Sequence, residues 1–174
     1  GVSDCPGDEF CHEGVCTDTM FLDSCKQDGW EPGRSYKLAS PIEAEEGSTC
    51  IKMDYSRSLG PNERVQEAFP ISYLNITFDC QGHSISEANQ AKTGLGIYLE
   101  GVRGVTIKNC EIFGFFSAVK LQDSILNTIR DNVIHSTEAG IYLSSDRYAR
   151  FWYPQYPERG QNVHGRPGFG NKIL

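Results

Sequence analysis

The chain has 174 residues, which is enough for one domain with a sizeable core. Its formal net charge is −7 at pH 7, and the acidic excess lies in residues 1–50, which hold 11 Asp or Glu against 3 Lys or Arg. The rest of the chain is nearly balanced, so no basic face is expected and nucleic acid is excluded as a partner. No run approaches the roughly 18 apolar residues that a membrane helix needs.

Seven cysteines are spread over the first two thirds of the chain. They are Cys5, Cys11, Cys16, Cys25, Cys50, Cys80 and Cys110. This number is high for a reducing compartment, and the spacings match no zinc pattern, so we predict disulfides, no metal and no cofactor. Because seven is odd, at least one thiol is free or bonds another chain. We expect an extracellular or cell-surface location. The N-terminal GVSDC is then either the mature end left by cleavage of a signal peptide or an artificial end of the sequence.

A repeat of 22 residues runs through the second half of the chain. At this shift one motif recurs at 96–99, 118–121 and 140–143, and a second recurs at 106–109 and 128–131. Upstream, 76–78 lead 105–107 by 29, as if seven residues were inserted within 86–94. Downstream, 171–173 trail 127–129 by 44, which is two periods.

This period fits either a leucine-rich repeat or a parallel β-helix, and Ile, Val, Gly and Asn dominate where a leucine-rich repeat would show Leu. We therefore predict an all-β protein, a parallel β-helix with about 22 residues per turn. Period-2 alternation points Val105 and Ile107 inward and Thr106 and Lys108 outward. The earlier pieces 35–38, 50–53 and 75–85 are expected to form irregular first turns, and 62–69 is the best candidate for a short helix.

Polar and glycine residues mark the predicted turns of the repeat. Gly96 and Gly140 are expected where the chain bends tightly. Asn109, Asp131 and Asn132 are expected at turns, where their side chains bond the backbone of neighbouring turns. The predicted organisation is a Cys-rich acidic segment at 1–32 and a β-helix at 33–174, with an insertion at 144–170.

The stretches NITFDCQGHSI, GIYLEGVRGVTIKNCEIFGF, GIYLSS and GNKIL carry a family resemblance over about residues 33–174. They resemble the right-handed parallel β-helix repeats of NosD-like and carbohydrate-associated surface proteins of archaea and bacteria. The resemblance implies the fold, and it implies no single activity, because such proteins include binding, structural and enzymatic members. The copper role of the NosD name does not carry over, since the four His are scattered and there are two Met.

The outward residues Asp79, Lys108 and Arg130 are expected to stack on successive turns of one face. In a polysaccharide-cleaving β-helix this face would carry the site, with Asp79 and Asp131 as the carboxylate pair and His83 as a base. The alternatives are a solvated charge ladder and, for His83, a polar residue that closes a bend; we favour both alternatives.

The cysteines suggest a partial disulfide map. Cys25 and Cys50 flank the first turns and are predicted to pair. Cys80 and Cys110 lie in corresponding halves of adjacent turns, so they form either a bridge or two buried thiols. One further bridge and one spare thiol remain for Cys5, Cys11 and Cys16, in an acidic knot that we expect to be solvated surface rather than a calcium site.

The segment 144–170 breaks the repeat and is rich in aromatic residues and arginine. Its candidate interface residues are Tyr148, Arg150, Phe151, Trp152, Tyr153, Tyr156 and Arg159. It is predicted to contact a partner, to cover the β-helix or to form a sugar-binding platform. The strand that begins at GNKIL leaves three options for the last turn: a fragment of a longer protein, a loop as cap, or pairing with the next subunit.

The favoured function is a non-catalytic structural protein of the cell surface. It is predicted to assemble with copies of itself, as a head-to-tail filament, or with other surface proteins. The rival prediction is a carbohydrate-binding or polysaccharide-cleaving β-helix. The candidate Asn75-Ile76-Thr77 triplet would accept a glycan in such a location.

Overall fold

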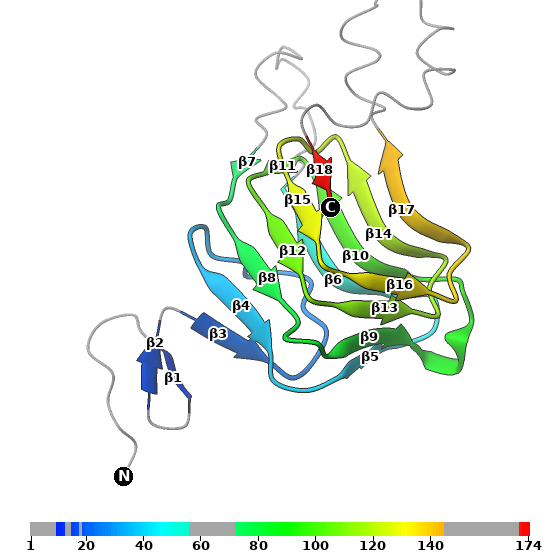
Figure 1. The fold of residues 1–174 in the computed structure, drawn as a ribbon, viewed down its shortest axis with the longest axis horizontal. Helices are drawn as coiled ribbons and strands as arrows, with labels where there is room; N and C mark the ends of the chain where they lie inside the picture. The colour runs from blue at the N-terminus through cyan, green and yellow to red at the C-terminus, as the bar shows by residue number, and fades with distance from the viewer. Residues whose placement is uncertain (1–9, 13–14, 18, 56–71, 145–170) are drawn as a thin grey trace, which may run out of the picture.

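The computed structural model describes residues 10–12, 15–17, 19–55, 72–144 and 171–174 (Figure 1). In this part of the chain the elements are short strands and one 3₁₀ turn, η1 (Ala88–Gln90). All the strand pairs are parallel except the hairpin of β1 (Phe10–His12) and β2 (Val15–Thr17). The chain is therefore a parallel β-helix, as the repeat predicts. The expected helix at 62–69 lies outside the described residues.

Three sheets form the faces of the solenoid, and each complete turn contributes one strand to each sheet, while the first sheet has one further strand at either end (Figure 1). The first face consists of β3 (Thr19–Leu22), β4 (Ser35–Leu38), β8 (Thr77–Asp79), β12 (Thr106–Lys108), β15 (Thr128–Arg130) and β18 (Lys172–Ile173). The second face consists of β5 (Ile42–Ala44), β9 (Ser84–Glu87), β13 (Glu111–Phe113) and β16 (Val133–His135). The third face consists of β6 (Thr49–Asp54), β10 (Leu95–Glu100), β14 (Ser117–Gln122) and β17 (Ala139–Ser144). A short pair, β7 (Ser72–Tyr73) and β11 (Val102–Arg103), lies between the third face and the first.

The strand register follows the offsets of the sequence repeat. Thr106 pairs with Thr128 at the predicted shift of 22, and Thr77 pairs with Thr106 at the predicted shift of 29. Thr128 pairs with Lys172 at the predicted shift of 44. The pieces 35–38 and 50–53 belong to the first complete turn, because β4 pairs with β8 and β6 pairs with β10.

The core fills the inside of the three faces. Val105 and Ile107 are fully buried, whereas Thr106 and Lys108 are half-buried on the outer side, so the predicted alternation is confirmed. At the front end, Trp30 is only 6% exposed and packs edge-on against Tyr36 and Phe78. Residues 19–32 of the predicted Cys-rich segment thus include a strand that pairs with the first complete turn and a buried aromatic residue that packs on it.

Asparagine side chains join successive turns. Asn132 accepts a hydrogen bond from the Cys110 backbone N–H (2.9 Å) and donates one to the Ile107 carbonyl (3.2 Å), which confirms its predicted role. Asn127 makes an equivalent pair of hydrogen bonds, accepting one from the Val105 backbone N–H and donating one to the Val102 carbonyl. These amides satisfy backbone groups that the corners between strands leave without ladder partners.

The residues inserted within 86–94 are held by one buried carboxylate. Glu87 is 1% exposed, and its two oxygens accept hydrogen bonds from the Gly47 N–H, the Gly94 N–H, and both the N–H and hydroxyl of Thr93. Burial by itself would raise the pKa of Glu87, but these donors outweigh it and hold the pKa below its usual value. Glu87 therefore fixes the inserted residues to the preceding turn as a charged group.

Gly96 and Gly140 lie inside β10 and β17, so the prediction that they sit at tight bends is wrong. Gly96 is needed for a close approach instead. A Cβ there would come within 2.5 Å of the Ala118 carbonyl oxygen and 2.9 Å of Ile112 Cγ2. At Gly140 the nearest atom, Ile134 Cγ2, is 3.8 Å away, which is an ordinary contact.

The two equivalent glycines give a matched stability test. Gly96→Ala is expected to lower the free energy of unfolding by about 1–3 kcal/mol, because the added methyl overpacks the core against backbone. Gly140→Ala is expected to be neutral or to stabilise by about 0.4–1 kcal/mol through the unfolded chain. Urea unfolding of both variants with the disulfides intact checks this, and equal midpoints would contradict the assignment.

Candidate functional site

The outer side of the first face carries a ladder of charged side chains. Asp79, Lys108 and Arg130 occupy the same register position on β8, β12 and β15, so the predicted stacking is confirmed. Lys37 on β4 extends the ladder, because it pairs with Asp79. We call these four residues the charged ladder.

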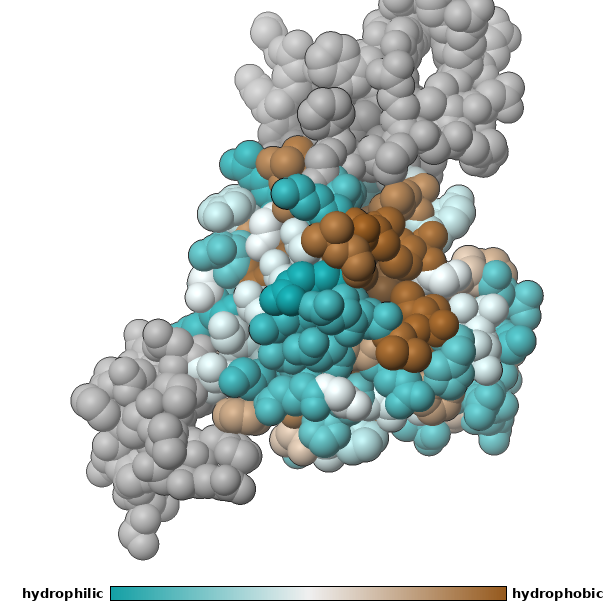
Figure 2. All heavy atoms as spheres, in the orientation of Figure 1, coloured by the Kyte–Doolittle hydropathy of each residue, from teal (hydrophilic) through white to brown (hydrophobic). Residues whose placement is uncertain are grey.

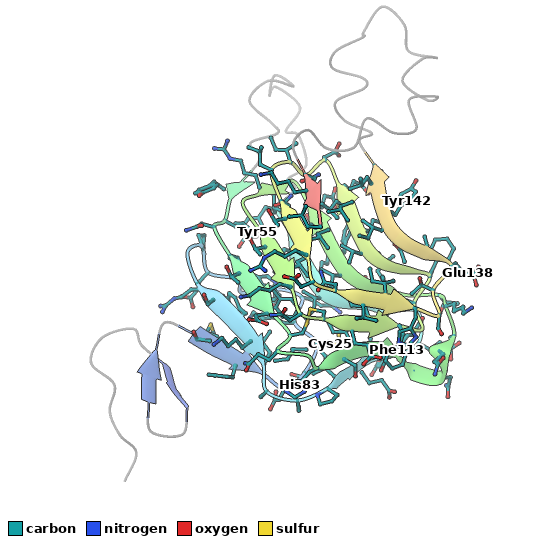
Figure 3. The ribbon with its side chains drawn as sticks, viewed as in Figure 1. Cys25, Tyr55, His83, Phe113, Glu138 and Tyr142 are labelled. Carbon is teal, nitrogen blue, oxygen red and sulfur yellow. A yellow bond between two sulfur atoms is a disulfide. The ribbon has the colours of Figure 1, made fainter. Side chains whose placement is uncertain are left out.

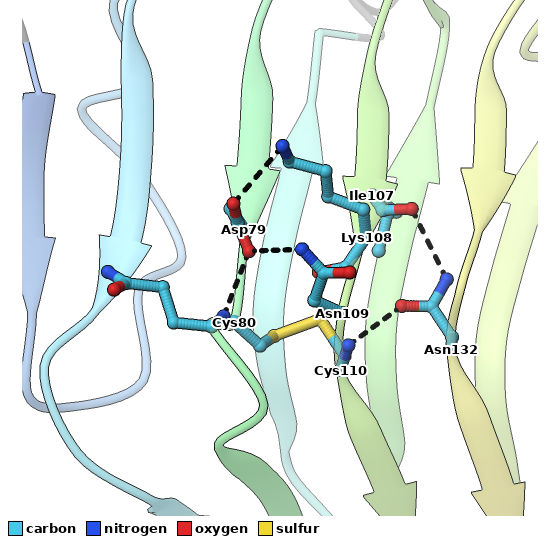
Figure 4. The surroundings of a disulfide bond; sticks show 8 residues. Asp79, Cys80, Ile107, Lys108, Asn109, Cys110 and Asn132 are labelled. Carbon is cyan, nitrogen blue, oxygen red and sulfur yellow. Dashed lines mark hydrogen bonds and ion pairs between the residues drawn. A yellow bond between two sulfur atoms is a disulfide. The ribbon is translucent and has the colours of Figure 1, made fainter.

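Asp79 is held by contacts within the ladder and the following turn (Figure 4). One carboxylate oxygen accepts hydrogen bonds from the Gln81 N–H and the Asn109 side chain, both 2.9 Å long, and the other lies 3.2 Å from Lys108 Nζ. Partial burial alone would raise the pKa of Asp79, but the Asn109, Gln81 and Lys108 donors together lower it. The carboxylate of Asp79 is thus ionised and bonded to neighbouring residues of the fold.

The proposed catalytic pair is separated along the ladder. Asp131 follows β15, two strands away from β8, and its carboxylate pairs with Arg130. His83 lies at the turn between β8 and β9 (Figure 3), where its backbone N–H donates a hydrogen bond to the Cys80 carbonyl. The catalytic assignments of Asp79, Asp131 and His83 stay predictions, and the contacts of these residues are typical of a charge ladder and a bend.

A second ladder, of hydroxyl groups, runs beside the charged ladder. Its members share one register position on five successive strands and are Thr19, Ser35, Thr77, Thr106 and Thr128. We call this set the hydroxyl ladder. In the described part of the chain, Thr77, Thr106 and Thr128 are half-buried and make no side-chain hydrogen bond. The repeat contained this ladder, since Thr106 and Thr128 are one period apart, but sequence reasoning did not single it out.

The third face has an outward ladder that the sequence analysis missed. It alternates lysine and tyrosine in the order Lys52, Tyr98, Lys120 and Tyr142. The Lys120 ammonium lies 5.3 Å from the Tyr98 ring centre and 5.9 Å from that of Tyr142, which projects outward from β17 (Figure 3). Because the lysine lies between the rings, these contacts act as cation–π stacking that stabilises the sheet.

Two disulfides tie the early turns together. Cys25 and Cys50 are bonded, as predicted, with Cα atoms 4.6 Å apart. Cys80 and Cys110 also form a disulfide, which decides between the two expectations for that pair. No side-chain placement is described for Cys5, Cys11 and Cys16, so their pairing stays a prediction.

The last described turn is exposed at the rear end of the solenoid. Ile134, Ile141 and Leu143 are half-buried there, while their partners one turn earlier are at most 1% exposed. Ile173 is 50% exposed, and apolar side chains gather over this end in Figure 2. We call the surface formed by β16, β17 and β18 the rear face. Among the described residues each of these strands has a hydrogen-bonded neighbour on one side only.

The predicted insertion interface, namely Tyr148, Arg150, Phe151, Trp152, Tyr153, Tyr156 and Arg159, lies outside the described residues. Within the described ranges, no three His, Cys, Asp or Glu side chains gather as a metal site would require. The same ranges contain no helix long and apolar enough to cross a membrane.

Comparison with known proteins supports the fold. Searches of curated proteins and of solved structures gave no match. Residues 69–151 match the family model described as "Right handed beta helix region", and this range includes strands of all three faces. The chain is thus a right-handed parallel β-helix repeat protein, while its resemblance to NosD-like proteins stays a prediction.

Proposed function

We propose that the protein is a non-catalytic structural protein of the cell surface that associates with copies of itself through the rear face. The observation that carries the proposal is the loss of burial in the last described turn. Solenoid turns bury their apolar side chains only against neighbouring turns, so the apolar surface that the described residues leave uncovered is available to a partner. A second copy supplies both strand edges and apolar surface.

The front end of the solenoid is covered, which favours contact between two rear faces over a head-to-tail filament. Trp30 covers the core there, and the Cys25–Cys50 disulfide and the parallel bridge between Lys26 and Ile51 hold the covering segment in place. Two rear faces in contact form a closed dimer with twofold symmetry, whereas rear-to-front contact would propagate into a filament. The head-to-tail filament remains the second outcome of the same test.

The first face favours a non-catalytic reading. A glycoside hydrolase needs one carboxyl group that can hold and donate a proton beside a second carboxylate. Asp79 has a lowered pKa and accepts hydrogen bonds from Gln81 and Asn109, and Asp131 pairs with Arg130 two strands away. This arrangement holds the Asp79 carboxylate in its charged form and pairs Asp131 with a cation rather than with a second carboxyl group.

The proposed location rests on the disulfides, because such bonds persist in oxidising compartments. Asn75 is exposed on the loop that leads into β8, so its side chain would be accessible as a glycan acceptor. Partners other than the chain itself would be further surface proteins or glycans.

Light scattering coupled to size-exclusion chromatography tests self-association, with the disulfides intact and protein concentration varied. We expect a dimer that dissociates on dilution. Ile173→Asp should shift the equilibrium to the monomer, because it places a charge in the contact. The control is Phe116→Asp, at a residue that is 53% exposed and precedes β14, which should leave the equilibrium unchanged. A mass of one chain at every concentration would refute the proposal.

A further inference from the structure

We propose that Asn75 carries an N-linked glycan and that Tyr73 and Leu126 form the surface against which the first sugars of that glycan pack. The inference rests on the proposed surface location, because Asn-X-Thr triplets accept glycans in secreted proteins. It deepens that proposal by naming the residues that hold the sugars. Asn75-Ile76-Thr77 is the one triplet of this kind in the sequence.

Asn75 lies in a row of residues along one corner of the solenoid, where β7 and β11 lie side by side (Figure 1). The Gly33 N–H donates to the Leu74 carbonyl next to Asn75, and the Gly104 N–H donates to the Leu126 carbonyl. The row therefore runs Gly33, Asn75, Gly104 and Leu126 on successive turns. All four have φ between +47° and +80°. We call these four residues the corner row.

The acceptor amide has space around it for a bulky substituent. Asn75 is exposed, and in the part of the chain that the structure describes its side chain makes no hydrogen bond. A Cβ added to Gly33, on the preceding turn, would meet no atom within 4 Å. The Thr77 hydroxyl is also without a hydrogen-bond partner among the described residues. Both polar groups of the triplet are thus available to a glycosyltransferase.

The modification is a group transfer from an activated sugar. Asn75 Nδ2 attacks C1 of a sugar carried on a polyprenyl pyrophosphate, so a C–N bond forms and the bond from C1 to the pyrophosphate oxygen breaks. The lipid pyrophosphate leaves, and the amide proton passes to a base of the transferase, which is a separate enzyme. No atom is oxidised or reduced.

An exposed aromatic ring lies two residues before the acceptor. Tyr73 is 60% exposed, although its ring is fixed in place. The ring lies against the bare Cα of Gly104, since a Cβ there would come within 2.6 Å of Tyr73 Cε2, and the Arg103 guanidinium lies 5.4 Å from the ring centre. The electron-rich face of such a ring attracts the C–H groups of a sugar, so Tyr73 can pack against the first sugar.

Leu126 extends this apolar surface along the corner row. It is 54% exposed and has φ +53°, a conformation that bulky side chains rarely adopt. The equivalent residue one turn earlier is Gly104, which adopts this conformation without strain. Strained residues of this kind gather at functional sites, and an exposed leucine points to a contact. Leu126 lies two strand spacings from Asn75, about 10 Å, which the sugars after the first can reach.

The position of the acceptor favours a glycan over a protein partner as the group that covers Tyr73 and Leu126. Asn75 belongs to the same corner row as Leu126, so a glycan attached there is already next to the apolar surface. Gly104, which lies between Asn75 and Leu126 in the row, has no side chain to block it, and the Tyr73 ring lies over its Cα. Sugars that extend along the row toward Leu126 therefore pass over that ring.

Mass spectrometry of the full chain, secreted from cultured animal cells, tests whether Asn75 is modified. Peptide-N-glycosidase converts a glycosylated asparagine to aspartate and so marks the site. We expect a glycan at Asn75 in the wild type and none in Asn75→Gln. Thr77→Ser keeps the hydroxyl and should keep the glycan, whereas Thr77→Val should lose it. An unmodified Asn75 in the folded, secreted wild type would overturn the inference.

The rate at which the same enzyme releases the glycan from the native protein tests the packing surface. A sugar that packs on Tyr73 must leave the ring before the enzyme reaches the bond to Asn75. Tyr73→Ala should therefore speed release about two- to tenfold, as expected for the loss of one aromatic contact, and Tyr73→Phe should behave as the wild type. Leu126→Asn suits the left-handed conformation, so it should raise the unfolding midpoint and yet speed release.

Tyr142→Ala is the matched control, because it removes a tyrosine that is 44% exposed on the third face. It should leave the release rate unchanged, and after denaturation all glycosylated chains should release the glycan at one rate. Equal native rates for the wild type, Tyr73→Ala and Tyr142→Ala would refute the packing surface. Light scattering keeps the two proposals separate. An Asn75→Gln chain that dimerises supports self-association without a glycan, and a glycosylated chain that stays monomeric refutes self-association alone.

Discussion

Replacing Trp30 by alanine is expected to lower the free energy of unfolding by about 3–5 kcal/mol, the cost of deleting a large buried aromatic side chain. Trp30 is 6% exposed at the front end of the core, where its ring centre lies 4.6 Å from that of Tyr36. Its indole N–H donates to the Lys52 carbonyl at 2.7 Å, and its own carbonyl accepts from the Tyr55 hydroxyl. The substitution therefore removes packing and a part-buried hydrogen bond together.

The measurement is urea unfolding followed by far-UV circular dichroism, with the disulfides intact. Trp30→Phe separates the two contributions, because it keeps most of the packing and leaves the Lys52 carbonyl without its donor. That variant should lose about 1–2 kcal/mol. Phe116→Ala, at a half-exposed aromatic residue, should change stability by less than about 0.5 kcal/mol. If Trp30→Ala cost no more than Phe116→Ala, Trp30 would not be the cover of the core.

Acid is expected to destabilise the protein through Glu87. The pKa of this carboxyl is lowered in the folded chain, because its four hydrogen-bond donors outweigh the effect of burial. In the unfolded chain the pKa returns to about 4.3. Below that pH the unfolded state binds the proton more readily than the folded state does. The contribution of Glu87 is thus fully present above about pH 5 and is lost as pH falls through the folded pKa.

Glu87→Gln tests this by removing the charge while keeping the shape. At pH 7 we expect a loss of about 1.5–3 kcal/mol, the contribution of hydrogen bonds to a charged group. Between pH 5 and pH 3 the stability of the variant should fall less steeply than that of the wild type. Asp79 also has a lowered pKa, so Asp79→Asn is the matched control that reports its separate share of the slope. Identical slopes for wild type and Glu87→Gln would rule out Glu87 as the acid-sensitive group.

The candidate site was only partly predictable, because strand pairing could be read from the sequence only where the repeat is regular. The repeat aligned Asp79, Lys108 and Arg130, since parallel strands one turn apart pair at the offset of the repeat. Lys37 was missed, because its pairing with Asp79 spans the segment 56–71, where no period can be counted. The third-face ladder was also missed, although Tyr98, Lys120 and Tyr142 are successive periods of the same motif.

Contacts across irregular segments required the tertiary structure. The sequence located an insertion within 86–94, but only the fold showed that Glu87 reaches back to Gly47. The prediction of a bend at Gly96 was wrong because glycine is favoured both at tight turns and where two backbones approach closely. Gly96 lies in a strand that passes close to the Ala118 backbone, and the sequence does not distinguish the two situations.

The sequence by itself determined the period, the inward and outward alternation, the register of the later turns and the pairing of Cys25 with Cys50. These properties follow from local spacing, because a solenoid turn contacts its immediate neighbours and repeats their pattern. The tertiary structure decided the Cys80–Cys110 bond, the cover formed by Trp30, the hydrogen bonds of Glu87 and the partial exposure of the last described turn. Those depend on the path of the chain between strands, where burial and hydrogen bonding are set by residues distant in sequence.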